Sequence, residues 1–511
     1  MSGGVDSMAL AALCSHLHQS PLQPPFFGLP PEIKSISFRA FVVDHGARQG
    51  SDLEANAVSK VLEQRGIDTQ VLKIDWANQK NPAILPNFET VARKARFQAL
   101  GKACRDAGIY ALLLAHHQDD QAETVLMRLL AGQRSTGLAG IKCSSELPEC
   151  RGIHGVHESG VLPEYADEWY PRPTSKANSI WQGPKCESGG VNVYRPFLCF
   201  GKDRLIATCE AEKIPWFEDH TNLDPTVTTR NAIRHMYKSF TMPTALMKPA
   251  LLKLADTWAA RDEDARRIAK ERLAECDIKS FDTRSGILTF RFPDLAGFRK
   301  GSGIIAAHIL RRVMMLLAPK EWIEIRSLHG AVKRIFPELF GEDKLSPTNF
   351  TVSKLLFKPL LSTWPSGEAQ KPIWLISREP YLGATLRSMQ LSILPSTNLP
   401  WTLYDNRYWF KIQNLHPTSS FILRPFRDGG SDTASFKEVF EKHFLNELLR
   451  DIAPGIVRWT LPALVLREEG GEERVVALPT LNISLPEIEG LVRWKVRYKK
   501  VNLDGFRDDQ A

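Results

Sequence analysis

The amino-acid sequence predicts an α/β protein with a parallel-sheet N-terminal domain, followed by a helical segment and a C-terminal α+β domain. Strand-like and helix-like segments alternate from the start of the chain to about residue 240. Such alternation is typical of a parallel sheet covered by helices on both faces. A glycine-containing turn precedes the first helical segment. After about residue 350 the pattern changes to short β-prone pieces, which indicates a separate fold.

The elements of the N-terminal domain follow from hydrophobic periodicity. Apolar residues spaced by three and four predict helices, whereas short apolar runs rich in β-branched residues predict strands. The expected helices cover residues 8–18, 52–65, 89–106 and 119–131. The expected strands cover residues 37–44, 69–74 and 110–116.

The remaining segments divide the chain into three expected domains. Residues 143–190 have no apolar period and contain several Pro and Gly, so a long surface insertion in the first domain is expected. Apolar residues recur at helical spacing in the middle of the chain. The expected domains are therefore 1–244, 245–345 and 346–511.

Composition excludes several classes of protein. Of the 511 residues, 43% are hydrophobic and 24% are charged, which argues against global disorder or a fibrous chain. No apolar run approaches the roughly 20 residues that span a bilayer, so no membrane partner is expected. The formal net charge of +8 permits an anionic partner without requiring one.

Cysteine usage argues against a disulfide scaffold and against a four-cysteine zinc site, because the eight Cys include no CxxC pair. Thiols such as Cys14, Cys104 and Cys209 are expected in the core. A zinc site in the insertion is disfavoured, because the spacings of its Cys and His match no common ligand pattern. The residues concerned are Cys143, Cys150, Cys186, His154 and His157.

The first motif is a six-residue turn before the first helix. Its two glycines allow backbone N–H groups to approach a polyanion closely, its serines add hydroxyl donors, and the helix presents its positive N-terminal end. This combination is suited to phosphate, although a plain turn before a helix is the alternative. The turn lacks the GK[ST] ending of a Walker loop. Its residues are Ser2, Gly3, Gly4, Val5, Asp6 and Ser7.

Polar residues follow two of the expected strands. Asp44 and His45 end one strand, where ligands bind in open parallel sheets. After another strand come His116, Asp120 and Glu123, with the two carboxylates on one helical face. This cluster can bind Mg²⁺, seat an ammonium group or accept a proton. The alternative is a helix capped by Asp119 or Asp120 with a solvated acidic start.

Two arginine pairs are candidates for phosphate or RNA contact. Arg93 and Arg96 share one face of an expected helix. Arg230 and Arg234 lie on adjacent helical turns after the string DHTNLD. In each case a solvated helix face is the alternative.

The C-terminal part contains further basic residues in β-prone pieces. Arg458 begins the string RWTLP, which precedes a β-prone piece. Near the end, a strand would place Arg493, Lys495, Arg497 and Lys499 on one face, where they can follow phosphates. A solvated edge strand is the alternative.

Together these strings identify a family resemblance. SGGVDS resembles the PP-loop of ATP pyrophosphatases, which transfer AMP and belong to the adenine nucleotide alpha hydrolase-like fold. With VDHGAR, ETVARKARF, LLLAHHQDDQAETVLMRLLAG, YRPFL…K and DHTNLD followed by RNAIR, residues 2–240 resemble tRNA(Ile)-lysidine synthetases in order and spacing. Phe97 stands where the family commonly has Tyr, and the insertion is longer than in compact bacterial members.

The resemblance implies an ATP-dependent ligase. ATP adenylates C2 of the wobble cytidine of tRNA(Ile) with a CAU anticodon, and free lysine displaces AMP to give lysidine. Asp6 with Ser2 to Ser7 is implied to bind ATP and Mg²⁺, and Asp120 with Glu123 to recognise the lysine ammonium. His116, Arg96 and Arg230 or Arg234 are implied to support AMP and the cytidine. The hairpin after Arg458 is implied to contact the acceptor stem.

The sequence leaves other functions and another location open. Another PP-loop enzyme that thiolates tRNA is disfavoured because it generally needs a persulfide cysteine or an iron–sulfur site. PP-loop domains normally place a hydrophobic strand before the SGG turn, and here only Met1 precedes it. We expect an incomplete N-terminus, with an inactive tRNA-binding protein as the alternative. Long insertions and a divergent C-terminal half favour a mitochondrial over a cytoplasmic location.

Overall fold

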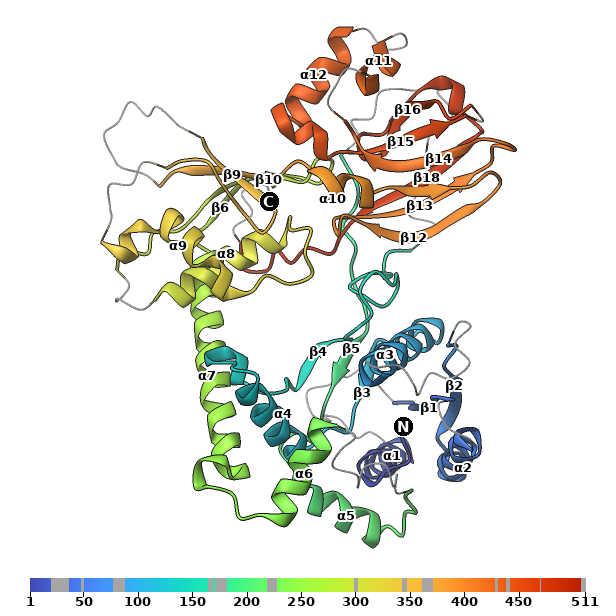
Figure 1. The fold of residues 1–511 in the computed structure, drawn as a ribbon, viewed down its shortest axis with the longest axis vertical. Helices are drawn as coiled ribbons and strands as arrows, with labels where there is room; N and C mark the ends of the chain where they lie inside the picture. The colour runs from blue at the N-terminus through green and yellow to red at the C-terminus, as the bar shows by residue number, and fades with distance from the viewer. Residues whose placement is uncertain are drawn as a thin grey trace. The chain divides into compact units, whose positions relative to one another are not determined.

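The computed structural model describes most of the chain in two compact units (Figure 1). The first unit comprises Met1–Arg151, Gly155–His157 and Gly190–Glu263, and the second comprises Gly152–His154, Glu158–Gly189 and Asp264–Ala511. The described residues are 1–19, 36–46, 50–76, 88–163, 169–170, 182–217, 228–297, 302–341, 347–360, 371–427, 431–437, 442–468 and 470–506. The string DHTNLD (219–224) lies outside the described residues.

The first unit contains the predicted alternation of strands and helices. The expected elements are confirmed with shifts of a few residues at their ends. Its helices are α1 (Val5–Gln19), α2 (Ser51–Gln64), α3 (Phe88–Asp106), α4 (Gln118–Leu130), α5 (Lys202–Ala211), α6 (Thr229–Ser239) and the start of α7 (Lys248–Leu273). Its strands are β1 (Arg39–Asp44), β2 (Asp68–Lys73), β3 (Ala111–Leu113), β4 (Ser144–Glu146) and β5 (Asn192–Tyr194).

These strands form two sheets within the described part of the chain. β1 and β2 pair in parallel, with Asp44 opposite Lys73 at their carboxyl ends. β5 pairs in parallel with β3 and antiparallel with β4. The buried amino group of Met1 donates to Phe41 O of β1, and burial with the nearby charge of Arg96 lowers its pKa to about 5. Apolar side chains of α1, α2 and α5 pack with β1 into one core.

The second unit is built on antiparallel sheets. Their strand orders are β6-β7-β10-β9-β8, β11-β14-β15-β16-β17 and β12-β13-β18. The strands are β6 (Asp277–Asp282), β7 (Ile287–Arg291), β8 (Phe350–Val352), β9 (Leu355–Leu360), β10 (Ile373–Arg378), β11 (Leu391–Ile393), β12 (Asn398–Tyr404), β13 (Tyr408–Asn414), β14 (Ser420–Pro425), β15 (Pro462–Arg467), β16 (Glu473–Leu478), β17 (Ile483–Ser484) and β18 (Val492–Tyr498). The helices are α8 (Gly303–Met315), α9 (His329–Ile335), α10 (Gly383–Ser388), α11 (Ser431–Lys437) and α12 (Lys442–Ile452).

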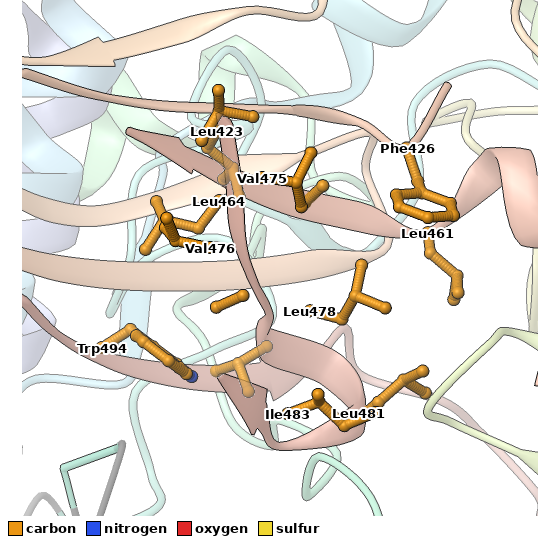
Figure 2. Packing of buried hydrophobic residues seen from close by; sticks show 14 of the residues in the cluster. Leu423, Phe426, Leu461, Leu464, Val475, Val476, Leu478, Leu481, Ile483 and Trp494 are labelled. Carbon is orange, nitrogen blue, oxygen red and sulfur yellow. The ribbon is translucent and has the colours of Figure 1, made fainter. Parts of the chain in front are cut away.

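Two apolar cores stabilise this unit. In one, side chains of β14, β15 and β16 meet Trp494 of β18; Figure 2 shows Leu423, Leu464 and Trp494 among them. In the other, helix α8 packs on the first sheet, and Phe290, Trp374 and Ile309 are fully buried there. Burial of such side chains contributes about 1.5–3 kcal/mol each.

The boundary between the two units differs from the expected domain limits. Helix α7 begins in the first unit and ends in the second. The segment 264–345 contains strands β6 and β7, which share a sheet with β8, β9 and β10 from the following segment. These residues therefore belong to one compact unit with the C-terminal part. The division into three domains stays a prediction.

Most of the insertion belongs to the second unit, which corrects the expectation of a surface loop. Tyr170 forms a β-bridge with Trp494, and Cys186 forms one with Tyr498, so insertion backbone pairs with strand β18. Glu187 is fully buried and lies 3.0 Å from Arg497 Nη1 and 2.7 Å from His154 Nε2. Within the described residues, no cluster of three or more His, Cys, Asp or Glu side chains could hold a metal ion.

The basic face predicted on the last strand is also corrected. Lys495, Arg497 and Lys499 do lie on β18 or just after it, but only 5%, 1% and 8% of their surfaces are exposed. Arg497 pairs with Glu187, and Lys499 Nζ donates to Ala318 O at 2.8 Å. Arg493 alone of this set is exposed. Lys495 and Arg497 are therefore covered by protein and are not available to phosphates.

Replacing Glu187 with Gln is expected to lower the free energy of unfolding by about 3 kcal/mol, because Arg497 would be left buried without its counter-charge. Chemical denaturation would measure the change. The control is Glu271→Gln, because Glu271 lies in an exposed pair with Arg267 on α7, which solvent screens, and its replacement is expected to change stability little. Equal effects of the two substitutions would contradict the account.

The same pair predicts a pH dependence. Burial raises the pKa of Glu187, but His154, the Gly160 amide and Arg497 outweigh burial and leave the pKa below its ordinary value. A carboxyl group of this kind stabilises the fold above its unfolded-state pKa. The difference between wild type and Glu187→Gln is therefore expected to persist at neutral pH and to shrink as the pH falls through the folded-state pKa.

Among the described helices, none combines the length and apolarity that crossing a bilayer requires.

Candidate functional site

The SGGVDS turn opens helix α1 in the first unit. Gly3 has a φ of 77°, and α1 begins at Val5, inside the motif. Ser7 Oγ donates to Gly4 O at 2.9 Å and lies 3.4 Å from Ser2 Oγ. The first amides of a helix have no intrahelical acceptor, so they and the two hydroxyls form a region suited to an anion.

Gly3 is held between two other elements of the unit. A Cβ atom at this position would lie 2.6 Å from Val58 Cγ2 of α2 and 3.2 Å from the Phe217 ring. Phe217 N also donates to Gly3 O at 3.0 Å. Both the positive φ and the close packing therefore require glycine here.

Replacing Gly3 with Ala is expected to lower the free energy of unfolding by more than the about 1–2 kcal/mol that a positive φ alone costs. Gly132→Ala is the matched control, because Gly132 has a φ of 72° and a Cβ atom added there would meet nothing within 4 Å. Thermal unfolding and binding of labelled ATP would be measured. Equal destabilisation by the two substitutions would show that the contact with Val58 is unimportant.

Asp6 belongs to the turn and contacts His117 at the start of helix α4. Its Oδ2 is 3.5 Å from His117 Nε2, and its buried Oδ1 has no hydrogen-bond partner among the described residues. Burial raises the pKa of Asp6, but His117, Lys202 and Arg234 outweigh burial and leave the pKa below its ordinary value. A charged carboxylate with one unpartnered oxygen fits a cation.

His117, rather than Asp119 or Asp120, is the N-cap of helix α4. Asp119 N donates to His117 Nδ1 at 3.2 Å, and His117 N donates to Asp120 Oδ2 at 3.0 Å, which completes a capping box. Burial lowers the pKa of His117, but the carboxylates of Asp119, Asp6 and Asp120 outweigh burial and raise it to about 9. Its Nε2 lies 3.5 Å from both Asp6 Oδ2 and Asp120 Oδ2. His117 thereby joins Asp6 to the acidic start of α4.

Asp119 connects three elements and is not free for a ligand. It accepts from Lys202 N of α5 at 3.0 Å and forms an ion pair with Lys248 of α7. The contact with His117 lowers the pKa of Asp119, and Lys248 lowers it further. Together they outweigh burial, which raises it, and hold the pKa well below its ordinary range.

Asp120 and Glu123 are buried and face helix α6. Arg234 Nε donates to Glu123 Oε1 at 2.7 Å, and Arg234 Nη2 lies 3.4 Å from Asp120 Oδ1. Arg230 Nε lies 3.3 Å from Glu123 Oε2, which has no well-aligned hydrogen bond among the described residues. The two predicted arginines therefore meet the two predicted carboxylates in one cluster.

Two buried histidines, His116 and His45, lie among arginines near this cluster. Burial, with the charges of Arg195, Arg230 and Arg96, lowers the pKa of His116 to about 4 against the opposing effect of Asp120. Burial and Arg96 also lower the pKa of His45. His116 Nδ1 and His45 Nδ1 are buried without partners in the described part of the chain. Both rings are therefore neutral at physiological pH.

Arg96 is the cation of this group that is suited to an external anion. Burial and the charges of Arg93 and Arg230 lower the pKa of Arg96, and no described carboxylate lies within ion-pair distance of it. Its guanidinium lies 5.3 Å from the centre of the Phe97 ring. Arg93 is exposed, lies over the same ring at 4.8 Å and pairs with Glu149 at 3.5 Å.

Asp44 has a local structural role. Its Oδ1 accepts from Gly46 N at 2.9 Å and from Ser51 Oγ at 2.7 Å, which ties the end of β1 to the start of α2. His45 O accepts from Trp76 Nε1 at 2.6 Å. Of this predicted pair, only the His45 ring has an unpartnered polar atom in the described residues.

The C-terminal candidates belong to the second unit. Arg458 lies in the 3₁₀ turn Gly455–Thr460, 5.8 Å from the centre of the Trp459 ring. Arg493 lies 5.8 Å from the centre of the Trp169 ring. Each therefore combines a cation with a neighbouring aromatic ring.

Sequence reasoning missed several residues of the site. Lys248 comes from a segment far from the motifs in sequence, and nothing in its local pattern indicates the contact it makes. Arg195 and Lys202 belong to the string YRPFL…K, but the sequence assigned neither of them a contact. His117 stands beside His116 in the predicted cluster, but one sequence cannot show which imidazole caps the helix. Trp76 follows the end of β2. Because ligands bind beyond the carboxyl ends of parallel strands, its position in the sequence could have identified it as a site residue.

Residues 1–238 match the family model described as the PP-loop domain. The first part of this chain is a PP-loop domain. Its glycine turn, its strand-end residues and α4 are the parts described above.

Almost the whole chain is similar to proteins named as tRNA(Ile)-lysidine synthases. A probable tRNA(Ile)-lysidine synthase of Schizosaccharomyces pombe is 29% identical over 95% of this chain and 91% of its own length. Bacterial tRNA(Ile)-lysidine synthases match shorter parts of the chain. That of Bradyrhizobium sp. is 29% identical over 53% of this chain and 54% of its own length. That of Methylobacterium nodulans is 33% identical over 44% and 48%.

A solved structure of a U34-tRNA thiolase from Methanococcus maripaludis aligns with a TM-score of 0.33 and 14% identity, over 51% of this chain and 71% of that one. Structural likeness at this level adds nothing to the similarity in sequence.

Proposed function

We propose that this chain uses ATP to adenylate C2 of the wobble cytidine of tRNA(Ile) with a CAU anticodon and then joins lysine to that carbon. The observation that carries the proposal is the arrangement of Asp6, the acidic pair and Arg96 around the start of α4 in a PP-loop domain. The names of the relatives support tRNA(Ile) as the substrate.

The phosphates of ATP are assigned to the turn from Ser2 to Ser7. Its amides and hydroxyls donate to phosphate oxygens, and the start of α1 favours negative charge. Asp6 would hold Mg²⁺ through its unpartnered Oδ1. Mg²⁺ commonly binds through one carboxylate together with phosphates and water, so a single protein ligand is sufficient. When bound, the ion neutralises charge on the phosphates.

Adenylation joins O2 of the cytidine to the α-phosphorus of ATP and releases pyrophosphate. The leaving pyrophosphate gains negative charge as its bond to the α-phosphorus breaks, and preorganised cations stabilise that charge. Arg96 is suited to this role because it has no described carboxylate partner. Neutral His116 and His45 leave the positive charge to the arginines while offering polar ring atoms to the nucleotide.

Lysine attachment then forms a bond between an amine nitrogen and C2, while the bond from C2 to the AMP oxygen breaks. The attacking amine loses a proton, which a carboxylate can accept. Asp120 and Glu123 are assigned to the ammonium group, and Glu123 Oε2 is the atom that lacks a well-aligned hydrogen bond within the described residues. Arg234 now occupies Glu123 Oε1 and Asp120 Oδ1 and must shift when the ammonium enters, whereas Asp120 Oδ2 accepts from His117 N.

Contacts with tRNA are assigned to exposed or half-buried cations. Arg93 lies on the PP-loop domain, and Arg458 and Arg493 lie on the second unit. We propose that the second unit contacts the acceptor stem through the latter two. Lys495 and Arg497 are not part of this proposal because they are buried.

The nucleoside product distinguishes this proposal from tRNA thiolation. After incubation of the protein with ATP, lysine and tRNA(Ile), mass spectrometry of the digested tRNA should show a cytidine whose mass has increased by lysine less water. An increase that corresponds to sulfur would support a thiolating enzyme. An unmodified nucleoside, together with binding of the tRNA, would support an inactive tRNA-binding protein.

We further propose a mitochondrial location. Similarity to a fungal relative over 95% of the chain and the long insertion at 143–190 support a eukaryotic organellar version of the enzyme. Imaging of a fluorescent fusion with a mitochondrial marker tests the proposal, and a diffuse cytoplasmic signal would contradict it.

A further inference from the structure

An aromatic pair lies at the carboxyl-end edge of the β1–β2 sheet. Trp76 follows β2, and His45 and Gly46 follow β1, so the parallel pairing brings these residues to one edge. Trp76 Nε1 donates to His45 O at 2.6 Å, which fixes the orientation of the indole. The Phe88 ring supports it at a centroid distance of 5.8 Å and an interplanar angle of 33°.

The two rings are only partly buried. Gly46 adjoins the indole, and a Cβ atom at Gly46 would lie 3.9 Å from Trp76 Nε1. Glycine at this position, with a φ of 58°, keeps the backbone close to the indole edge without a side chain between them. The pair therefore offers a fixed, partly accessible aromatic surface at an edge of the sheet where nucleotides bind.

The groups beside this surface are suited to the rest of a nucleotide. His45, whose backbone oxygen accepts from Trp76, carries a buried Nδ1 without a described partner, and burial and Arg96 lower the pKa of its ring. Arg96 itself has no described carboxylate partner. An aromatic face, a neutral hydrogen-bonding ring and an unpartnered cation match the base, the polar edge and the phosphate of a nucleotide.

We infer that Trp76, supported by Phe88, is the surface on which a nucleobase stacks in this site. The inference rests on the proposed function for the identity of the nucleotide. Two sources share the required chemistry, namely the adenine of ATP and the unstacked wobble cytosine of tRNA. Stacking on an aromatic side chain tolerates any base because every base has a π-face.

Two substitutions separate stacking from the hydrogen bond to His45. Trp76→Leu removes both, whereas Trp76→Phe removes the hydrogen bond and keeps an aromatic face. Binding of labelled ATP and of an anticodon stem-loop RNA would be measured separately by equilibrium dialysis with the full-length protein. Trp322→Leu is the control, because Trp322 is an exposed tryptophan of the second unit.

Trp76→Leu is expected to weaken binding of one of the two probes by roughly 5- to 150-fold, and Trp76→Phe is expected to restore most of it. Weaker ATP binding alone assigns adenine to Trp76, and weaker RNA binding alone assigns cytosine. Unchanged binding of both probes, or equal losses in Leu and Phe variants, would overturn the inference. These readouts do not require turnover, so wild-type protein that binds ATP normally but transfers no lysine would contradict the proposed function alone.

Discussion

Replacing Glu123 with Gln is expected to lower the rate of lysidine formation by about 100-fold or more, the range typical of a lost acid–base group. Glu123 is the member of the acidic pair that contacts both Arg230 and Arg234, and its Oε2 is also assigned to the incoming ammonium. The substitution keeps the shape and removes the charge. The loss should appear both in kcat and as a higher KM for lysine.

Part of the effect of Glu123→Gln is on stability, so folding must be measured beside activity. The two arginines are about one-third exposed, at 35% and 32%, and solvent therefore screens the charges left unpaired. Glu210→Gln is the control, because Glu210 is exposed on α5 of the same unit. A Glu123→Gln enzyme that folds normally and retains full activity would remove Glu123 from the mechanism.

Replacing Asp6 with Asn is expected to lower adenylation by at least about 100-fold, because a charged group that stabilises the transition state is lost. Asp6 combines an unpartnered buried Oδ1 with contact to His117 through Oδ2. The readout is release of pyrophosphate from ATP in the presence of tRNA but without lysine, which isolates the first step.

Asp52→Asn is the matched control for Asp6, since Asp52 is an exposed aspartate in the first turn of helix α2. Raising the Mg²⁺ concentration should partly restore the Asp6→Asn enzyme if its defect is weak metal binding. Pyrophosphate release that is equal in the two variants would show that Asp6 has no part in adenylation.

The PP-loop domain could be predicted from the sequence because its signals are local. Helices α1 to α4 have apolar residues at helical spacing, and β1 is a short run of β-branched and aromatic residues after a turn. The motifs stand at strand ends, and parallel pairing brings such ends together. Glu123, Arg230 and Arg234 were each singled out in the sequence, but their ion pairs are seen only in the structure.

The second unit could not be predicted in the same way because its pairings join distant segments. Strands β6 and β7 lie in a segment with helical periodicity on both sides. β6 pairs with β7, and β7 pairs with β10, more than eighty residues further along the chain. The alternation on β18 correctly placed Lys495 and Arg497 on one face. It could not show that Glu187 of the insertion covers that face, because burial there depends on tertiary contacts.

Site residues without a local signal were missed for the same reason. Lys248 reaches Asp119 from the start of α7, more than a hundred residues further along the chain. Trp76 shows no periodicity that separates a site residue from a core residue, and only its hydrogen bond to His45 O reveals the orientation of its ring.

Incorporation of labelled lysine into tRNA(Ile) with a CAU anticodon tests the central claim most directly. We expect ATP-dependent transfer of one lysine per tRNA, with AMP and pyrophosphate released in equal amounts. We expect no transfer to the same tRNA carrying uridine at the wobble position, since the accepting carbon belongs to cytidine. Absence of labelled lysine from the CAU tRNA, in a protein that is folded and binds ATP, would contradict the account.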